Sequence, residues 1–391
     1  MLAKSTESEK GTQLFSGKEL RPLFRAIETL PERLPPWLPV AAAKVIEKPT
    51  AFAAEEQAVV LGYGDGTVRA VEPNGKERWT FNAGKAVTGL ALASGLPWRV
   101  LAGSDDGFVY ALDASGKKVW ASELRPAEGG DRRSPYVSEF LLADLTGDGV
   151  PEVIAPNTER WLVALRPQDG SELWATRIPP NYRFGDLVCP RELRTKDGPR
   201  IVIGDSWFYG GGWKQVDARG QIVGTFGGMW VGGRVSGIAV ADFDGDGAAD
   251  VCVARYRVID TIEHFTGGTQ VAWKVRTDEP VTALVALSRP QAAPLIVAGT
   301  RSGWIMALDA KGQVVWRHCL TAGVKHLAPL AGSHLAATLQ DGRVLRLDWQ
   351  GQVHALAKLN SPDYHVAATP SGSALFVVTA NGELTRFELP K

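Results

Sequence analysis

The stretch F-V-Y-A-L-D-A-S-G-K-K-V-W, residues Phe108–Trp120, contains the pattern from which most of the chain is built. Apolar residues alternate up to a tight turn at Asp113–Gly116, and a second short segment ends on Trp120. Alternation with a period of two, followed by a turn that contains glycine, predicts a β-hairpin.

The same hairpin recurs along the chain. Clear copies are Ala70–Trp79, Ala164–Trp174 and Ala307–Trp316, and weaker copies are Val216–Gly224, His264–Trp273 and Leu347–Ala355. Each copy closes a unit of four short apolar segments, and a unit follows about every forty to fifty residues, which is typical of β-propeller blades. The sequence therefore predicts an all-β chain that forms a single β-propeller.

The last unit sets the number of blades. It begins near Tyr364 and ends at Leu389 after three segments, so its fourth strand must come from elsewhere. A ring closes when the other end of the chain supplies that strand, because the pairing removes two exposed edges. We predict eight blades closed by a strand within Leu14–Val40, with seven blades as the alternative count.

The region before the repeats is treated separately, as an N-terminal segment of residues 1–40 ahead of a propeller of residues 41–391. In this segment Lys18–Leu30 places apolar residues at helical spacing before Pro31, which predicts a short amphipathic helix. No apolar run in the sequence is long enough to predict a transmembrane helix. Residues 1–11 are polar and lack the apolar core of a secretory signal, so these residues leave the compartment open.

Charge and cysteine content argue against several classes of function. The chain has 43 basic and 43 acidic side chains, a net charge of zero. A protein that binds nucleic acid through phosphates needs clustered, uncompensated Lys and Arg, so we expect no nucleic-acid partner. The three cysteines, Cys189, Cys252 and Cys319, are widely spaced, which argues against a disulfide scaffold and against a structural zinc site.

The hairpins resemble the tryptophan-docking repeats of quinoprotein-type (PQQ-like) propellers, whose pattern is A-x-D-x-x-x-G-x-x-x-W. The resemblance implies that one tryptophan per unit wedges between adjacent blades, and the matching residues are Trp79, Trp120, Trp174, Trp273 and Trp316. Gly224 and Ala355 stand where tryptophan would be, so two contacts between blades must pack differently. Quinone-dependent enzymes of this family carry an adjacent pair of cysteines, which this sequence lacks, so we expect no PQQ. The resemblance also favours an extracytoplasmic location.

Two loops have the composition of calcium sites. Asp242–Asp250 reads D-F-D-G-D-G-A-A-D, and Asp144–Glu152 reads D-L-T-G-D-G-V-P-E. Carboxylates at this spacing in a tight loop converge on one point, and Ca²⁺ takes about six to eight oxygen ligands. The candidate ligands are Asp242, Asp244, Asp246 and Asp250 in one loop, and Asp144, Asp148 and Glu152 in the other, where Thr146 replaces an aspartate. The loops resemble those of FG-GAP (integrin-type) repeats, so we expect structural Ca²⁺; the alternative is an Asx-turn without an ion.

Loops of units three to five are longer than their counterparts and contain more aromatic and arginine side chains. They follow second strands or connect units, and in a propeller these loops open on one face. The candidate ligand-binding residues there are Arg160, Trp161, Tyr182, Arg183, Trp207, Tyr209, Trp213, Trp230, Arg234, Arg255 and Tyr256. Aromatic rings with arginine suit an acidic sugar, and the same residue types dominate protein-binding hot spots. The alternative is that these side chains only cover the mouth of the ring.

We therefore expect a non-catalytic propeller that binds a glycan or a protein through the loops of units three to five. One enzymatic alternative uses the same residue types: a calcium-dependent lyase acting on an acidic polysaccharide, with a Tyr or His base and Arg beside the uronate carboxylate. A structural assembly subunit is the third alternative. No hydrolase, zinc-protease or P-loop motif is present, so no catalytic residue is assigned.

Overall fold

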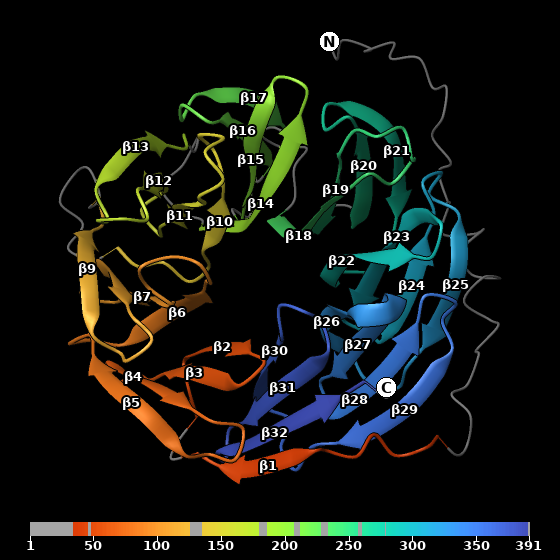
Figure 1. Cartoon of the computed structure of the whole chain (residues 1–391). Helices are drawn as coiled ribbons and strands as arrows, with labels where there is room; N and C mark the ends of the chain where they lie inside the picture. The colour runs from red at the N-terminus through yellow and green to blue at the C-terminus, as the bar shows by residue number, and fades with distance from the viewer. Residues whose placement is uncertain are drawn as a thin grey trace, which may run out of the picture.

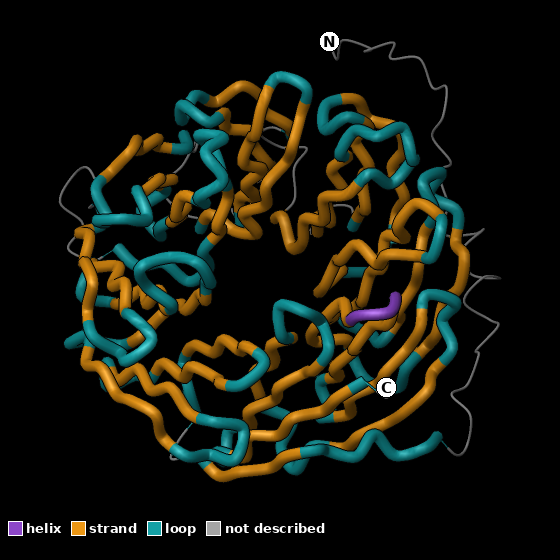
Figure 2. The backbone as a smooth tube through the Cα atoms, in the orientation of Figure 1, coloured by secondary structure: helices purple, strands orange, loops and turns teal. Residues whose placement is uncertain are grey.

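The computed structural model describes residues 34–45, 48–125, 135–179, 186–206, 212–227, 234–256, 260–277 and 279–389. These residues form eight four-stranded antiparallel sheets, which are arranged in a ring (Figure 1). Strands and short turns make up nearly all of the described backbone, and its one helical element is a 3₁₀ turn at Ala331–Ser333 (Figure 2). The predicted eight-bladed β-propeller is therefore confirmed.

The first four blades follow one another along the chain, each running outward from the central channel. Their strands are β2 (Ala51–Glu55), β3 (Ala58–Gly62), β4 (Thr67–Val71) and β5 (Glu77–Asn82) in blade 1; β6 (Val87–Leu92), β7 (Val100–Ser104), β8 (Phe108–Leu112) and β9 (Lys118–Glu123) in blade 2; β10 (Leu141–Ala143), β11 (Glu152–Pro156), β12 (Trp161–Leu165) and β13 (Glu172–Arg177) in blade 3; β14 (Leu187–Thr195), β15 (Gly198–Asp205), β16 (Trp213–Asp217) and β17 (Ile222–Phe226) in blade 4.

The remaining blades repeat this order, except that blade 8 takes its outer strand from the N-terminal region. Their strands are β18 (Arg234–Ala241), β19 (Asp250–Tyr256), β20 (Thr261–Thr266) and β21 (Gln270–Arg276) in blade 5; β22 (Val281–Arg289), β23 (Ala292–Thr300), β24 (Trp304–Leu308) and β25 (Val314–Cys319) in blade 6; β26 (Val324–Leu330), β27 (His334–Leu339), β28 (Arg343–Asp348) and β29 (Val353–Lys358) in blade 7; β30 (Tyr364–Ala368), β31 (Ala374–Thr379), β32 (Glu383–Glu388) and β1 (Ala41–Lys44) in blade 8.

The core lies between blades rather than within them. Second strands such as β3 and β7 are buried at every position, because both faces of each sheet are covered by its neighbours. Outer strands such as β9 keep one buried residue, Trp120, among exposed ones. In stacked sheets of this kind the sequence of a second strand is therefore a continuous apolar run, whereas apolar and polar residues alternate in the strands farther out.

The docking tryptophans of five blades pack against glycines in the hairpin turns of the next blade. The pairs are Trp79 with Gly116, Trp120 with Gly170, Trp174 with Gly220, Trp273 with Gly312 and Trp316 with Gly351. Four of these indoles also donate their Nε1 hydrogen to a backbone carbonyl of that turn, at 2.7–3.0 Å. The wedge role that the sequence resemblance implied is confirmed for these tryptophans.

The junctions without a docking tryptophan are packed in three other ways. At Gly224 the amide of Gln215, in blade 4, donates to the carbonyl oxygen of Gly268 in blade 5. At Ala355 the indole of Trp37 fills the space between blades 7 and 8, and its Nε1 donates to the Glu388 oxygen at 3.0 Å. Between blades 8 and 1 the small side chain of Ala43 lies against Gly75.

The ring is closed by β1, which pairs antiparallel with β32 in the register Ala41 to Arg386. The predicted source of this strand, Leu14–Val40, is wrong at its boundary: the strand begins at Ala41, directly after that segment. The stretch before it runs beside blade 7, where Pro36 forms a parallel bridge with Leu356. The predicted helix at Lys18–Leu30 lies outside the described residues.

A second set of contacts joins the first strands around the channel. Thr50 donates its hydroxyl to the Val87 oxygen of the next blade at 2.6 Å, and Thr282 does the same to Val324 at 2.6 Å. In blade 7 the ammonium of Lys325 takes this position and donates to the Tyr364 oxygen at 3.2 Å. None of the described elements is a helix of the length and apolar character needed to cross a bilayer.

Substitution of Gly351 by alanine tests the tryptophan–glycine contact. Gly351 has a φ of +83°, and an added Cβ would lie 2.6 Å from Cδ2 of Trp316. We expect Gly351→Ala to lower the free energy of unfolding by about 1–2 kcal/mol for the left-handed backbone and by roughly 1–3 kcal/mol more for the overlap with the indole. The matched control is Gly95→Ala, which has a φ of +80° and no atom within 4 Å of the added Cβ. Equal losses in denaturant unfolding would contradict the role of the contact.

Substitution of Trp37 tests the substitute wedge at the junction of blades 7 and 8. Trp37 is 6% exposed, whereas its neighbour Leu38 is 69% exposed. We expect Trp37→Ala to destabilise the protein by about 3–5 kcal/mol, as for other buried large-to-small changes, and Leu38→Ala to change stability by less than about 0.5 kcal/mol. Thermal unfolding of both variants measures this, and a small effect of Trp37→Ala would show that the junction is held without the indole.

Candidate functional site

The ends of the strands define two faces of the ring. On one, which we call the connection face, lie the turns between second and third strands and the connections from blade to blade. On the other, which we call the hairpin face, lie the turns between first and second and between third and fourth strands. Those predicted ligand-binding residues that the structure describes lie at strand ends on the connection face of blades 3–5, and the two aspartate loops lie on the hairpin face.

Six of the eleven predicted ligand-binding residues are described by the structure. Tyr182, Arg183, Trp207, Tyr209 and Trp230 lie outside the described residues. Of the six, Trp161, Arg234 and Tyr256 are half-buried at strand ends on the connection face, whereas Arg160, Trp213 and Arg255 are buried.

Arg160 ties the turn of blade 3 to blade 4. Its guanidinium donates to both carboxylate oxygens of Asp205, at 3.2 and 2.6 Å, and its Nε donates to the Ile178 oxygen at 3.2 Å. Arg160 is 3% exposed and Asp205 is 8% exposed. A buried two-point pair of this kind fixes the geometry of both loops, because neither charge can be left without its partner.

The backbone of the same turn is held by Asn157. Its side-chain oxygen accepts hydrogen bonds from the backbone N–H groups of Glu159 and Trp161, both at 3.0 Å. Its amide nitrogen donates to the Arg125 oxygen, at 3.0 Å, at the end of blade 2. Asn157 was not among the predicted residues, although an asparagine at the start of a turn is a recognisable signal.

Arg255 and Trp213 are also held inside the protein. Arg255 pairs with Glu263 of the neighbouring strand β20, and Lys274 lies 3.5 Å from the same carboxylate. The ring of Trp213 stacks on Phe226, with centroids 3.9 Å apart, and meets Phe265 edge-on at 4.9 Å. In this structure neither side chain is offered to a ligand on the surface.

Two pairs of arginine and aromatic side chains remain nearer the surface. The Arg125 guanidinium lies 5.3 Å from the ring centre of Trp161, and the Arg234 guanidinium lies 5.5 Å from that of Tyr256. Both pairs stand where strands meet loops of the connection face, one between blades 2 and 3 and the other in blade 5. Arg125 was not among the ligand-binding residues predicted from the sequence.

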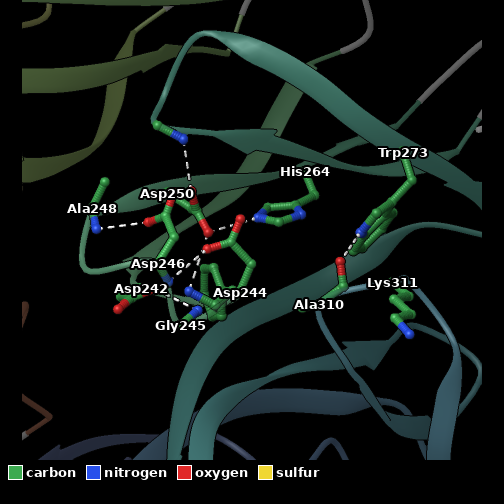
Figure 3. Close-up of polar contacts among 12 residues, drawn as sticks. Asp242, Asp244, Gly245, Asp246, Ala248, Asp250, His264, Trp273, Ala310 and Lys311 are labelled. Carbon is green, nitrogen blue, oxygen red and sulfur yellow. Dashed lines mark hydrogen bonds and ion pairs between the residues drawn. The ribbon is translucent and has the colours of Figure 1, made fainter.

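The aspartate loop of blade 5 is built on a network of backbone hydrogen bonds. Asp242 accepts from the N–H groups of Gly245 and Gly247, at 2.7 and 3.0 Å, and Asp246 accepts from Ala248 at 2.7 Å. Figure 3 shows these carboxylates beside Asp244 and Asp250 at the turn between β18 and β19. The backbone therefore fixes where the carboxylate oxygens point.

Asp242, Asp244 and Asp250 bring one oxygen each to within 4.8 Å of one another. Burial, and after it the charges of Asp250, Asp246 and Asp242, raise the pKa of Asp244 against the opposing hydrogen bond from the Asp246 N–H. This crowding is what a hard divalent cation would relieve, since Ca²⁺ takes carboxylate oxygens. The residues present therefore fit such an ion.

Asp250 is the last residue of this loop, and its side chain is buried. Its oxygens accept from the backbone N–H groups of Phe243 and Gly267, at 3.1 and 2.7 Å, and one of them lies 3.1 Å from Nε2 of His264 (Figure 3). His264 is 1% exposed and its ring lies 5.4 Å from the docking Trp273. The loop is thus coupled directly to the packing between blades 5 and 6.

The loop of blade 3 has the same backbone scaffold but different charges. Asp144 accepts from the N–H groups of Gly147 and Gly149, at 2.7 and 2.9 Å, as Asp242 does in blade 5. At the position of Asp244, however, Thr146 donates its hydroxyl to Glu152 at 3.3 Å. A hydrogen bond therefore replaces the repulsion between two carboxylates, and among the described residues only the blade 5 loop gathers three metal-type side chains.

A pocket that the sequence did not predict lies between blades 1 and 2. Its volume is about 480 Å³, and its wall includes Glu55, Arg78, Trp79, Arg99 and Ala114. Arg99 pairs with Glu55, and Arg78 donates to the Gln57 oxygen at 2.8 Å, so both arginines have internal partners.

Comparison with known proteins supports the fold. Residues 51–211 match the PQQ-type family model described as outer membrane protein assembly factor BamB. A search among curated proteins gave no match.

Many solved structures share the architecture. BamB from Moraxella catarrhalis is 18% identical, with a TM-score of 0.65 over 90% of this chain and 99% of that chain. Sqt1 of Saccharomyces cerevisiae is 14% identical, with a TM-score of 0.64 over 91% and 100%. The Dos1 propeller is 12% identical, with a TM-score of 0.67 over 92% and 95%. At these identities the likeness concerns the fold alone: the chain is an eight-bladed β-propeller, and its residues 51–211 are similar to the PQQ-type repeats of the matching family model.

Proposed function

We propose that the chain is a non-catalytic propeller that binds a protein partner on the connection face of blades 3–5. The observation that carries the proposal is the contrast between two kinds of arginine on this face. Arg160 and Arg255 are buried in ion pairs that hold the loops in place. Arg125 and Arg234 lie over aromatic rings nearer the surface, and Arg125 there also pairs with the carboxylate of Glu172 at 2.6 Å. Rigid loops that present arginine and aromatic side chains suit a protein-binding hot spot. Such loops lose little conformational entropy when a partner binds.

The burial of Arg255 bears on the lyase alternative. That alternative needs an arginine free to neutralise a uronate carboxylate, and Arg255 is one of the candidate ligand-binding arginines on this face. Its guanidinium already faces Glu263 and is 7% exposed. A side chain engaged in this way supports binding rather than catalysis, because breaking a buried pair leaves an uncompensated charge.

The similar proteins also favour a protein partner. The matching family model is described as an assembly factor, and one similar structure, 12% identical with a TM-score of 0.57, is titled as BBS1N in complex with ARL6DN. Propellers of this architecture therefore include proteins that form complexes with other proteins. This supports a protein partner for the present chain over a glycan.

We also propose that the blade 5 loop binds one structural Ca²⁺ through Asp242, Asp244, Asp246 and Asp250. The crowding of Asp244 against Asp250 and Asp242 supports the assignment, and the backbone network holds the loop ready for an ion. In the blade 3 loop, Asp144, Asp148 and Glu152 would form a weaker site, because the Thr146 hydroxyl supplies no charge. The ion would link the loop to Asp250 and so to the junction between blades 5 and 6.

Substitution of Arg234 tests the protein-binding surface. The variant Arg234→Ala should lower the affinity for the partner about thirtyfold, which corresponds to a hot-spot contribution of about 2 kcal/mol. The control is Arg69→Ala, which removes an arginine that lies 5.7 Å over Tyr63 in blade 1. Tagged protein expressed in its native cells, with partners quantified by mass spectrometry and affinities then measured on the purified pair, provides the readout.

Two outcomes would contradict this proposal. The first is equal capture by the wild type and both variants. The second is the appearance of an ultraviolet-absorbing unsaturated product when the wild type is incubated with a uronate polysaccharide, since that product is the mark of a lyase.

Calcium titration tests the metal proposal. At a hundredfold excess over the dissociation constant, CaCl₂ should stabilise the wild type by about 2.7 kcal/mol, and Asp244→Asn should abolish most of that gain. In the absence of calcium, Asp244→Asn should be at least as stable as the wild type. Burial, and after it the charges of Asp250, Asp246 and Asp242, raise the pKa of Asp244 in the folded state, so its ionised form costs stability above that pKa. The control, Asp148→Asn in the blade 3 loop, should keep the response. A wild-type melting temperature that calcium does not change would refute the site.

A further inference from the structure

The pocket between blades 1 and 2 has a partly apolar lining. Four of its lining side chains are buried and aliphatic, namely Ala58, Val60, Ala70 and Val100, and the indole of Trp79 forms another part of the wall. The volume of about 480 Å³ lies within the usual range of ligand pockets, roughly 300–1,000 Å³. A lining of this kind suits an apolar side chain or ring better than a hydrated ion.

The charged side chains around the pocket already have partners within the protein. Arg99 forms an ion pair with Glu55, and Arg78 donates to the Gln57 oxygen at 2.8 Å. Glu56 accepts a hydrogen bond from a backbone N–H of blade 8 at 3.1 Å. Because two arginines and two glutamates cancel in charge, the lining favours neither an anion nor a cation, and an uncharged group is the expected occupant.

Trp79 differs from the other four docking tryptophans in its hydrogen bonding. Those four donate their Nε1 hydrogen to a carbonyl of the turn that receives them, whereas no described residue accepts the Nε1 hydrogen of Trp79. The corresponding carbonyl is that of Ala114, which stands two residues before the receiving Gly116, as the acceptor Ala310 stands before Gly312. Ala114 lines the pocket, and its oxygen accepts no hydrogen bond from the described residues.

The next junction, between blades 2 and 3, shows what fills the corresponding space. Trp98, at the end of the turn before β7, is fully buried and lies edge-on to the docking Trp120, with ring centroids 6.2 Å apart and an interplanar angle of 86°. Its Nε1 donates to the Pro167 oxygen at 2.7 Å, and the same carbonyl accepts from Nε1 of Trp120 at 3.0 Å. Two indoles therefore share one turn carbonyl at that junction.

The strand register shows that Gln57 holds in blade 1 the place that Trp98 holds in blade 2. Each docking tryptophan lies in a row of paired residues across three strands, and the rows are Val60, Ala70 and Trp79 in blade 1 and Leu101, Ala111 and Trp120 in blade 2. Gln57 and Trp98 each stand three residues before the first member of their row. Because blade 1 has no tryptophan at this position, Trp79 is the only aromatic side chain in the described lining of the pocket.

We propose that this pocket receives the tryptophan side chain of a protein partner. The incoming indole packs edge-on against Trp79 and donates its Nε1 hydrogen to the Ala114 oxygen, as Trp98 does to Pro167 at the next junction. Tryptophan is enriched in protein-binding hot spots, and its N–H requires an acceptor when the ring is buried. A residue within a chain is favoured over the free amino acid, because the paired charges of the lining leave no partner for an ammonium and a carboxylate. The pocket lies apart from the connection face of blades 3–5 and does not depend on the surface proposed there.

A neutral analogue of a tryptophan residue, N-acetyl-L-tryptophanamide, tests the pocket by fluorine NMR of protein labelled with 5-fluorotryptophan. The probe should shift the resonance of Trp79 with a dissociation constant on the order of 0.1–1 mM. The resonance of Trp120 should stay unchanged, because Trp98 already occupies the space beside it; Trp79→Phe and Trp120→Phe assign the two signals. N-acetyl-L-phenylalaninamide has no indole N–H and should bind about fivefold more weakly, which corresponds to the loss of one hydrogen bond.

A pair of variants at the exposed residue Gln57 tests the position without disturbing the core. Gln57→Trp supplies an indole from the chain itself and should weaken binding of the probe on the order of tenfold, whereas Gln57→Ala should bind it as the wild type does. The proposal is overturned if the probe leaves Trp79 unshifted in the wild type, if the phenylalanine analogue binds equally well, or if both Gln57 variants respond alike. Free L-tryptophan binding on the order of tenfold more tightly than the neutral analogue would assign the pocket to the free amino acid, which also overturns it.

Discussion

The structure depends on one repeated contact, the packing of an indole on a glycine of the next blade. Each sheet is too thin to bury its own apolar surface, so the ring is stable only while neighbours stay in contact. A glycine is required at the receiving end because any side chain would occupy the place of the ring, as at Gly351 under Trp316. The same turn often supplies a carbonyl to the indole N–H, so position and orientation are set together.

Much of the fold could be predicted because the repeat is local in sequence. The spacing of glycine and tryptophan lies within one hairpin, and the missing strand of the last unit implied closure by the other end of the chain. The closing strand itself was misplaced because its sequence, A-A-A-K, carries no alternation by which to recognise it. The role of Trp37 was also hidden, since its partners Phe387 and Glu388 lie at the opposite end of the chain.

The sequence predicted which residue types gather at the candidate site, but it did not predict which of their side chains are exposed. Arginine and aromatic residues do gather at the connection face, yet a sequence does not show that Arg160 meets Asp205 across two blades. Trp213 was hidden in the same way, because the rings that cover it come from other strands. The aspartate loop of blade 5 was easier to predict, since its geometry arises within nine consecutive residues. The sequence also shows directly that Thr146 of blade 3 stands at the position of Asp244.

Closure by β1 also constrains the order of events during biosynthesis. The ribosome makes residues 41–44 early, but their partner β32 emerges last, more than three hundred residues later. Until then seven complete sheets are present in an open arc, and two edges remain able to pair with another nascent chain. Loss of β32, a strand of 6 residues, would therefore leave the arc open permanently, so a deletion this short should be far more damaging than its length suggests.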